Sequence, residues 1–354
     1  MMKKTLVATA AILSLGSAFA QSNVTLYGVI DTAFQSQNNQ NGGGSLTQIN
    51  SGAISGSRFG FKGTEDLGGG NNALFQLEGG FNPANGASGQ GGLMFGRQAF
   101  MGLSGSWGKF TVGRQYDQMF EHLGNFDPLW GISNATNTGF YLAYDGAKTT
   151  AFDGGGNIRI NSSARYGFAA GGFSGAVMYG TGGIAGASSA GSYKGLNASY
   201  AAGSLNVGAA WQSKNLETSA TSTNGTQSNT EVGANYGFGP ARVFFNYQTT
   251  KASASTGTSK VTTLGLNYDI TPTVGLLAAY YNDKIAGNGL SAKRNTLGLG
   301  VTYSLSKRTM VYGYLDTTKA DAGYAASPAG LGVNASGAAN TSQNTYMLGL
   351  RHAF

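Results

Sequence analysis

Segments in which apolar and polar side chains alternate recur along almost the whole length of this 354-residue chain. In residues 295–305, for example, every second side chain is Leu, Val or Tyr, and the positions between them are Thr, Gly or Ser. A period of two places these two sets on opposite faces of a β-strand. The segment also has the length of about 9–11 residues with which a tilted strand crosses a bilayer. The pattern therefore predicts strands with one apolar and one polar face, each able to span a membrane.

The order of these segments predicts an all-β, antiparallel transmembrane barrel. About 16 segments follow the pattern, and bacterial barrels contain an even number of strands. Long and short connections alternate between them, as long outer loops and short periplasmic turns do in such barrels. All five prolines lie in connections, where no ladder hydrogen bond is lost. The connections expected to be long are residues 36–51, 83–92, 117–156, 181–191, 215–228, 252–258, 285–291 and 319–342.

The composition favours a membrane barrel over other all-β proteins. The chain has 59 Gly, 18 Tyr, 19 Phe and no Cys, and aromatic side chains suit pleated surfaces. Its mean hydropathy is only −0.14, because alternate side chains of a barrel face a polar lumen. The alternatives are a soluble all-β protein and a Gly-rich fibrous surface protein. Neither explains aromatic-rich apolar faces on one unbroken series of strands.

The N-terminus has the features of a secretory signal peptide. Lys3 and Lys4 precede an apolar run, residues 6–15, and residues 18–20 (AFA) form a small-x-small end. The apolar run is shorter than the roughly 20 residues of a membrane-spanning helix. We therefore expect cleavage after Ala20, with residues 1–20 as signal peptide and residues 21–354 as a barrel domain in the Gram-negative outer membrane.

The formal net charge of +7 is modest and dispersed. Removing Lys3 and Lys4 leaves 20 basic side chains (22 − 2) against 15 acidic ones, a net charge of +5. Export takes the chain away from nucleic acid, which a basic chain could otherwise bind. We expect anions in or around a pore, and no nucleic-acid partner.

Several blocks of sequence resemble the general porins of Gram-negative bacteria, in particular their β-proteobacterial branch. The blocks are residues 24–31 (VTLYGVID), 57–68 (SRFGFKGTEDLG), 95–103 (FGRQAFMGL) and 113–117 (GRQYD), together with the terminal Phe354. They match the first, second and fourth strands, the entry to the third loop and the last residue of that branch. Their order along the whole chain is more specific than any single block.

The resemblance implies a function and an assembly. Members of this family form 16-stranded, homotrimeric barrels through which small hydrophilic solutes and inorganic ions diffuse. Their third loop folds into the lumen and forms a constriction, where basic side chains on the wall face acidic side chains on the loop. The terminal aromatic, here Phe354, is read by the barrel assembly machinery before the barrel enters the lipid bilayer.

The alternation predicts which basic side chains face the lumen. We expect Phe59 and Phe61 to face lipid, which turns their neighbours inward. We also expect Phe100 to face lipid, and Ile158 and Ile160 to face lipid on either side of an inward arginine. An arginine turned to lipid at mid-bilayer would cost about 2–4 kcal/mol. The predicted basic wall of the constriction consists of Arg58, Lys62, Arg97 and Arg159.

The family's motifs match three of these residues, Arg58, Arg97 and Arg159, to its constriction. The alternative is that each arginine only solvates the lumen wall or its rim. Arg165 and Arg294 also have inward parity, but no family motif singles them out.

The third loop is expected to supply the acidic side of the constriction. Asp127, which precedes Pro128, matches the family's loop position, and Glu121 is the second candidate. The other acidic residues available on this loop are Asp117, Asp145 and Asp153.

Two further features of this region carry predictions. The spacing of Met119, Phe120 and Leu123 predicts a short helix packed inside the barrel wall. Arg114 shares parity with outward-facing residues, so we assign it to loop anchoring or to a subunit contact.

No catalytic pattern is visible. The two histidines are His122, in the third loop, and His352, whose lipid-side parity indicates a membrane-interface aromatic. Nucleophile-elbow and zinc-helix motifs are absent from the sequence. We therefore expect no enzyme, metal site or cofactor.

Three functions remain open. The first is a general diffusion porin with a moderate anion preference. The second is a substrate-specific channel for an anion such as phosphate or an organic acid, built on the same basic wall. The third is a non-transport structural barrel, which a conductance measurement would separate from the other two.

Overall fold

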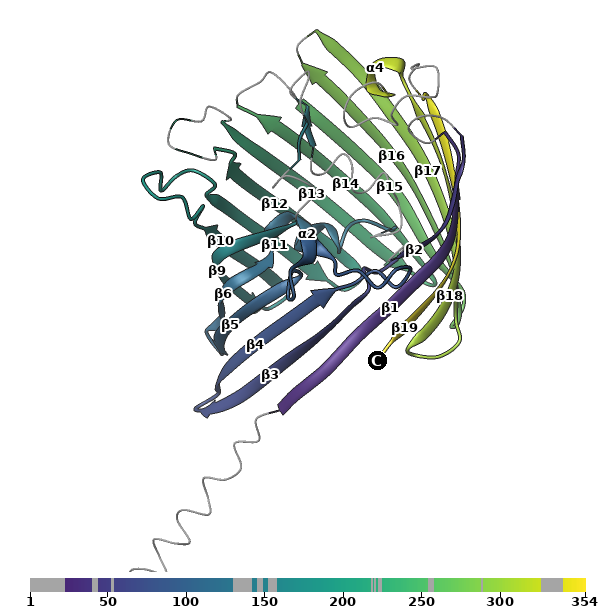
Figure 1. Cartoon of the computed structure of the whole chain (residues 1–354). Helices are drawn as coiled ribbons and strands as arrows, with labels where there is room; N and C mark the ends of the chain where they lie inside the picture. The colour runs from purple at the N-terminus through teal and green to yellow at the C-terminus, as the bar shows by residue number, and fades with distance from the viewer. Residues whose placement is uncertain are drawn as a thin grey trace, which may run out of the picture.

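The computed structural model shows a closed β-barrel (Figure 1). It describes residues 23–39, 44–51, 54–129, 142–144, 149–151, 158–217, 219, 221, 225–253, 258–287, 289–325 and 340–354. The predicted signal peptide, residues 1–20, lies outside the described residues, as do Asp145 and Asp153.

Sixteen antiparallel strand positions form the barrel, as predicted. β19 pairs with β1 and closes the sheet. The second position is divided between two strands, because β1 pairs with β3 through residues 23–29 and with β2 through residues 32–37. The first half contains β1 (Asn23–Gln37), β2 (Leu46–Ser51), β3 (Arg58–Gly68), β4 (Asn71–Gly80), β5 (Gln98–Gly105), β6 (Gly108–Tyr116), β9 (Arg159–Ala170) and β10 (Phe173–Gly180). The second half contains β11 (Tyr193–Ala202), β12 (Leu205–Asn215), β13 (Thr226–Phe238), β14 (Ala241–Ala252), β15 (Thr258–Thr271), β16 (Val274–Gly287), β17 (Leu290–Ser304), β18 (Thr309–Ala320) and β19 (Ser342–Ala353).

The alternation in the sequence becomes the two faces of the barrel wall. On β17, Leu297, Leu299 and Val301 are 42–46% exposed on the outward face. Arg294 and Thr296 alternate with them on the inward face and are almost fully buried. The outward face is therefore the apolar, lipid-facing surface that the pattern predicts.

Short turns join the strands at one end of the barrel, and longer connections join them at the other. Gly171 and Gly172 form the turn between β9 and β10 with φ of 57° and 85°, a conformation that glycine adopts readily. The longer connections mark the extracellular end. The prediction of a long connection at 285–291 is wrong, because β16 and β17 stay paired up to Gly287 and Leu290.

The remaining secondary-structure elements of the described residues are short and lie in the connections between barrel strands. They are η1 (Gln90–Gly92), α2 (Gln118–Leu123), β7 (Leu142–Tyr144), β8 (Thr149–Ala151) and α4 (Ala322–Ala325). α2 belongs to the third loop, between β6 and β9, and contacts β10 to β13 (Figure 1). No helix in the described part of the chain is long and apolar enough to cross a membrane.

Candidate pore constriction

A cluster of charged side chains surrounds Glu78 on the inward face of β4. Arg97 Nε donates to Glu78 Oε1 at 2.8 Å, and Arg58 Nε lies 3.8 Å from Glu78 Oε2. The Tyr27 hydroxyl, on β1, also donates to this carboxylate, at 2.9 Å. Glu78 is only 4% exposed, so these partners satisfy a charge that burial alone would make costly.

Tyr116, at the end of β6, links two arginines of this cluster. Its hydroxyl accepts from Arg97 Nη2 at 2.7 Å and from Arg159 Nη2 at 3.2 Å. Arg159 Nε donates to the Arg97 carbonyl at 3.0 Å, and its guanidinium lies 4.7 Å from the centre of the Tyr116 ring. The structure thus brings the predicted Arg58, Arg97 and Arg159 together.

Glu78 is a residue of this cluster that the sequence reasoning missed. The signal is present, because Leu77 and Phe75 on the same strand pair with residues of β3, and Leu77 lies opposite the outward Phe61. Parity alone therefore turns Glu78 into the lumen. The family resemblance directs attention to acids of the third loop, and Glu78 lies on the wall instead.

Two of the orientations used to predict the basic wall are wrong. The first is that of Phe100, which faces inward and is 9% exposed, whereas its neighbour Met101 is 64% exposed. Arg97 nevertheless points inward, because it precedes the first residue of β5 and is not held to that strand's alternation.

The predicted outward orientation of Ile158 and Ile160 is also wrong. Both side chains are buried in a cluster with Met119 and Leu123 of the third loop. A bulge is the reason: Ser162 has φ of 47°, and the β6–β9 register shifts beyond Gly113. A bulge interrupts the period of two, so parity read from one side of it fails on the other.

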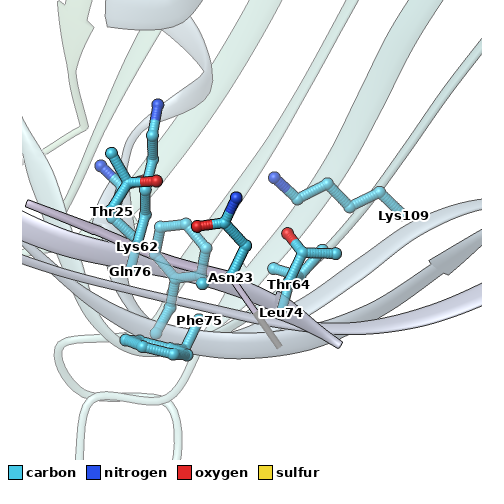
Figure 2. Close-up of a pocket in the computed structure, with 10 residues that line it drawn as sticks. Asn23, Thr25, Lys62, Thr64, Leu74, Phe75, Gln76 and Lys109 are labelled. Atoms are coloured by element: carbon cyan, nitrogen blue, oxygen red, sulfur yellow. The ribbon is translucent and has the colours of Figure 1, made fainter. Parts of the chain in front are cut away.

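Lys62 lies four positions beyond Arg58 along β3, towards the short turns. Its Nζ stands 5.2 Å from the Tyr27 ring centre. It lines a hollow of about 340 Å³ together with Thr25, Gln76 and a second lysine, Lys109 of β6 (Figure 2). The basic wall therefore continues below the arginine cluster, with Lys109 as a member that was not predicted.

The third loop begins with the predicted short helix, α2. Asp117 is its N-cap and accepts from the Phe120 N–H at 2.7 Å. Burial raises the pKa of Asp117 to about 7. Met119 and Leu123 are buried against inward side chains of the barrel, and the Phe120 ring stacks on Tyr116.

The two predicted loop acids have partners away from the Glu78 cluster. Glu121 Oε2 accepts from Arg165 Nη2 at 2.7 Å. Asp127 accepts from the Tyr281 hydroxyl of β16 at 2.7 Å and from the Leu129 N–H at 2.9 Å. Burial raises the pKa of Asp127 to about 6. The structure therefore places both acids in contacts between the loop and the wall.

The third loop packs against a series of inward-facing glycines on the barrel wall. A Cβ added to Gly233 would lie 2.4 Å from the Phe126 ring, and one added to Gly265 would lie 2.1 Å from Pro128. Such distances are far inside van der Waals contact, so the loop occupies the space that a side chain would fill. The glycines that approach the loop in this way are Gly208, Gly233, Gly265 and Gly298.

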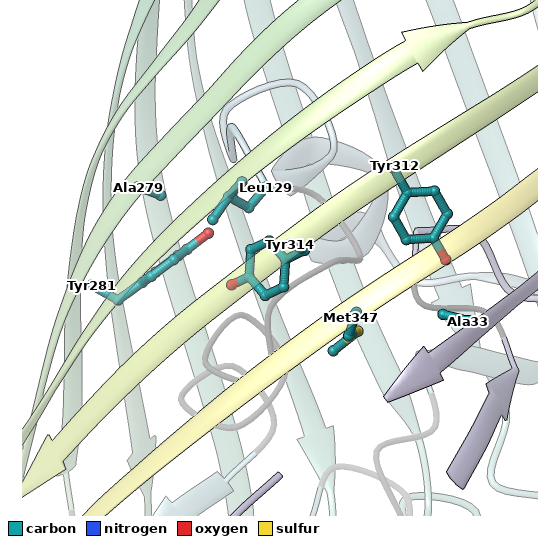
Figure 3. Close-up of a cluster of buried hydrophobic side chains, with 7 residues drawn as sticks. All are labelled: Ala33, Leu129, Ala279, Tyr281, Tyr312, Tyr314 and Met347. Atoms are coloured by element: carbon teal, nitrogen blue, oxygen red, sulfur yellow. The ribbon is translucent and has the colours of Figure 1, made fainter. Parts of the chain in front are cut away.

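The far end of this loop segment packs in an apolar cluster on the same side of the barrel. Leu129 is fully buried there, beside Tyr281, Tyr314 and Ala279 (Figure 3). His122 is buried as well, with Nδ1 3.1 Å from Glu231 Oε2 of β13. These contacts give His122 a structural place in the loop.

Arg114 of β6 joins the connection between β4 and β5 to the start of β9. Its Nε donates to the Gly96 carbonyl at 2.8 Å, and its Nη1 bonds the Asn161 side chain in the β9 bulge. Among the described residues no group of His, Cys, Asp and Glu side chains could hold a metal ion.

Comparison with known proteins gives matches along the whole chain. The sequence profile of the Gram-negative porins matches residues 7–323. Outer membrane porin protein 32 of Delftia acidovorans is 33% identical over 377 residues, which cover 100% of both chains. An outer membrane porin protein of Bordetella pertussis is 41% identical over 157 residues, 40% of this chain and 41% of that protein.

Solved structures also match this chain over most of its length. The anion-selective porin from Comamonas acidovorans is similar with a TM-score of 0.78 at 26% identity, over 94% of this chain and 100% of that chain. The trimer form of OmpT from Vibrio cholerae matches with a TM-score of 0.66 at 17% identity, over 94% and 99% of the two chains. The latter likeness concerns the fold alone.

Proposed function

This chain belongs to the Gram-negative porin family, and we propose that its water-filled outer-membrane channel passes small hydrophilic solutes with a moderate preference for anions. The observation that carries the preference is the cluster of Arg58, Arg97 and Arg159 around the carboxylate of Glu78. Arginine stays charged at physiological pH, so positive charge exceeds negative charge in this cluster. The similarity to a porin described as anion-selective supports the same assignment.

The third loop is proposed to narrow the pore beside this cluster. Supporting this, α2 and residues 124–129 contact inward side chains on strands from β10 to β18. A barrel of this strand number without such a loop would be an open aqueous channel with little selectivity.

Glu78 is proposed as the main moderator of the anion preference. It bonds Arg97 directly, whereas Glu121 and Asp127 are engaged by Arg165 and Tyr281. The loop acids then act at longer range, where salt screens them more strongly.

A planar-bilayer measurement under a salt gradient tests this function. At low salt the sign of the zero-current potential should indicate anion preference. The magnitude of this potential should decrease as salt rises. The physical reason is that the screening length shrinks from about 10 Å at 0.1 M to about 3 Å at 1 M. Cation preference in the unmodified channel would overturn the proposal.

A substrate-specific anion channel is the second candidate, favoured by the hollow between Lys62 and Lys109. Thr25 and Gln76 add hydrogen-bonding groups to these two charges (Figure 2). Inorganic phosphate that blocks chloride current at low concentration would support this candidate. Additive currents of the two ions would support general diffusion.

We further propose a homotrimer that is exported with cleavage after Ala20. Phe354 is proposed as its assembly signal, and its backbone exchanges two 3.0 Å hydrogen bonds with Gly28 of β1. A folded sample that is monomeric by light scattering would contradict the proposed trimer. A mature N-terminus other than Gln21 would remove the cleavage site.

A further inference from the structure

The second strand position of the barrel contains an insertion. The ladder between β1 and β2 ends at Thr32 and Ser51, and the ladder between β1 and β3 begins at Val29 and Arg58. Two residues of β1 therefore stand opposite six residues, 52–57. An ordinary β-bulge adds one residue to one strand. Four additional residues are more than a ladder can absorb, so part of this stretch must leave the wall.

Residues 54–57, which we call the inward segment, lie on the lumen side of the wall. The carboxylate of Asp31, on the inward face of β1, accepts from the Ile54 N–H at 3.0 Å and from the Ser55 N–H at 2.6 Å, both through Oδ2. Its Oδ1 accepts from the Tyr312 hydroxyl of β18 at 2.6 Å. Tyr312 is itself an inward side chain, so these bonds hold the segment inside the barrel.

Asp31 is committed to this segment. It is fully buried, and a buried carboxylate is costly unless hydrogen bonds satisfy it. Its main chain is engaged as well, because its N–H donates to Ser57 Oγ and Ser57 Oγ donates to its carbonyl, each at 3.0 Å. Hydrogen bonds to an ionised group are the stronger ones. Asp31 therefore fixes both ends of the inward segment.

One face of the inward segment contacts the arginine cluster. A Cβ added to Gly56 would lie 2.7 Å from Arg97 Nη1, so the guanidinium packs directly on the Gly56 backbone. Arg58 Nη1 donates to the Gly56 carbonyl at 3.4 Å. Gly56 itself is exposed. The segment therefore supports two of the three arginines and still faces open space.

The other end of the inward segment reaches the third loop. The Ile54 side chain packs against the apolar cluster that contains Leu129 of the loop and Ala33 of β1 (Figure 3). The segment thus occupies the part of the inner wall between the arginines and the place where the loop packs.

We propose that the inward segment is a third side of the pore constriction, and that Asp31 is the positioning residue that holds it in the lumen. The proposal rests on the proposed function, in which ions pass the arginine cluster. The segment narrows the path between the arginines and the third loop, and its backbone keeps Arg58 and Arg97 directed at a passing anion. The alternative is a filler of the wall that no permeating ion approaches.

The width is tested by deleting residues 53–56. This removes the four additional residues, and because their number is even, Arg58 keeps its inward orientation. Single-channel conductance is measured in 1 M salt, where a screening length of about 3 Å leaves width as the main determinant. The conductance should rise, and the anion preference at low salt should fall. Deleting residues 184–187, a turn between β10 and β11 on the far side of the barrel, should change neither. Equal conductance in both deletions and the unmodified channel would overturn the proposal.

Exposure to the permeation path is tested with a single thiol, since the chain contains no cysteine. An anionic methanethiosulfonate reagent should react with Gly56→Cys and lower its single-channel current, and a reductant should restore the current. Ser106→Cys is the control, because Ser106 is exposed in the short turn between β5 and β6. Its labelling should leave the current unchanged. A Gly56→Cys thiol that does not react, or that reacts without loss of current, identifies the segment as filler.

The role of Asp31 is tested with two substitutions. Asp31→Ala removes the acceptor of both backbone N–H groups and should lower the ratio of inward to displaced segment about 10- to 100-fold. Its conductance should therefore be higher and noisier than that of the unmodified channel. Asp31→Asn keeps an acceptor oxygen and should restore the unmodified conductance. Equal conductance in all three would show that Asp31 does not position the segment.

The proposed function fails in a different way. Cation preference in the unmodified channel would overturn the function of the arginine cluster, whereas the conductance in 1 M salt and the reaction of Gly56→Cys would still report the width set by the inward segment. If the Asp31→Ala barrel does not fold, the deletion and the thiol still decide the proposal.

Discussion

The two sides of the inner wall meet the pore in opposite ways. On β3 to β9 the inward side chains include long, charged ones, and Arg58, Arg97 and Arg159 gather around Glu78. On β12 to β17 the corresponding positions include glycines, and the third loop fills the space they leave. The charged side carries the proposed ion selectivity, and the glycine side holds the loop that is proposed to set the pore width. The same inward face therefore presents charged side chains to the pore in one region and, in another, glycines that leave room for the third loop.

The glycine side offers the largest expected effect. In the double variant Gly233→Ala/Gly265→Ala, each new methyl would meet the loop, at Phe126 and at Pro128, closer than 2.5 Å. Overpacking of this kind costs about 1–3 kcal/mol, or about 5- to 150-fold in the ratio of seated to unseated loop. We expect higher and noisier single-channel conductance.

A matched control is available on the same face of the wall. A Cβ at Gly300 would meet its nearest atoms at 3.4 Å or more, so Gly300→Ala should leave conductance unchanged. If both variants behave alike, the glycine side does not seat the loop.

The charged side is tested by neutralising its three arginines together. In Arg58→Gln/Arg97→Gln/Arg159→Gln, only the Glu78 carboxylate of the cluster remains, so the zero-current potential should move to the cation side. One charge at 4 Å is worth about 1 kcal/mol in water, or about fivefold in the permeability ratio at low salt. Arg114→Gln should shift the potential less, because Arg114 bonds Gly96 and Asn161 and not Glu78. An unchanged potential in the triple variant would remove the proposed constriction.

The contrast between the two sides also separates what the sequence could predict from what it could not. Strand number, closure and the outward face follow from a period of two that each strand carries locally. The arginine cluster could be predicted because Arg58, Arg97 and Arg159 stand in family motifs. Ile158 and Ile160 could not be placed, because the bulge near Ser162 interrupts the period, and nothing in the neighbouring residues marks it.

The seat of the loop was hidden for a different reason. In the sequence, Gly233 and Gly265 resemble ordinary strand glycines. The residues that occupy the space above them lie more than a hundred positions away in the chain. Asp127 was predicted to oppose the basic wall, but its partner Tyr281 is 154 positions distant. Only the closed barrel brings such residues together.

Glu78→Gln sharpens the comparison on the charged side, with a smaller effect. It removes the carboxylate bonded to Arg97 and leaves the shape of the cluster similar. The anion preference should rise, by up to about fivefold in the permeability ratio at low salt. Tyr27→Phe removes a hydrogen bond to the same carboxylate without changing charge, and it should shift the potential much less. A Glu78→Gln channel with weaker anion preference would contradict the role given to Glu78.

The smallest effect concerns the charge on the loop itself. Burial raises the pKa of Asp127 from 3.8 to about 6, so the seated loop binds this proton more tightly than an unseated one. The corresponding stabilisation is complete below about pH 3.8 and is lost as pH rises through about 6. Between pH 5 and pH 7 the loop gains a negative charge, and the anion preference should fall slightly.

Asp127→Asn should remove most of this pH dependence of the zero-current potential. Asp117 titrates near the same range, because burial raises its pKa to about 7. Asp117→Asn separates the two carboxylates, since asparagine is also a good N-cap and should keep α2 in place. If the pH dependence survives Asp127→Asn and disappears in Asp117→Asn, the titrating group is Asp117 at the start of α2. Asp127, which is bonded to Tyr281, would then not be responsible.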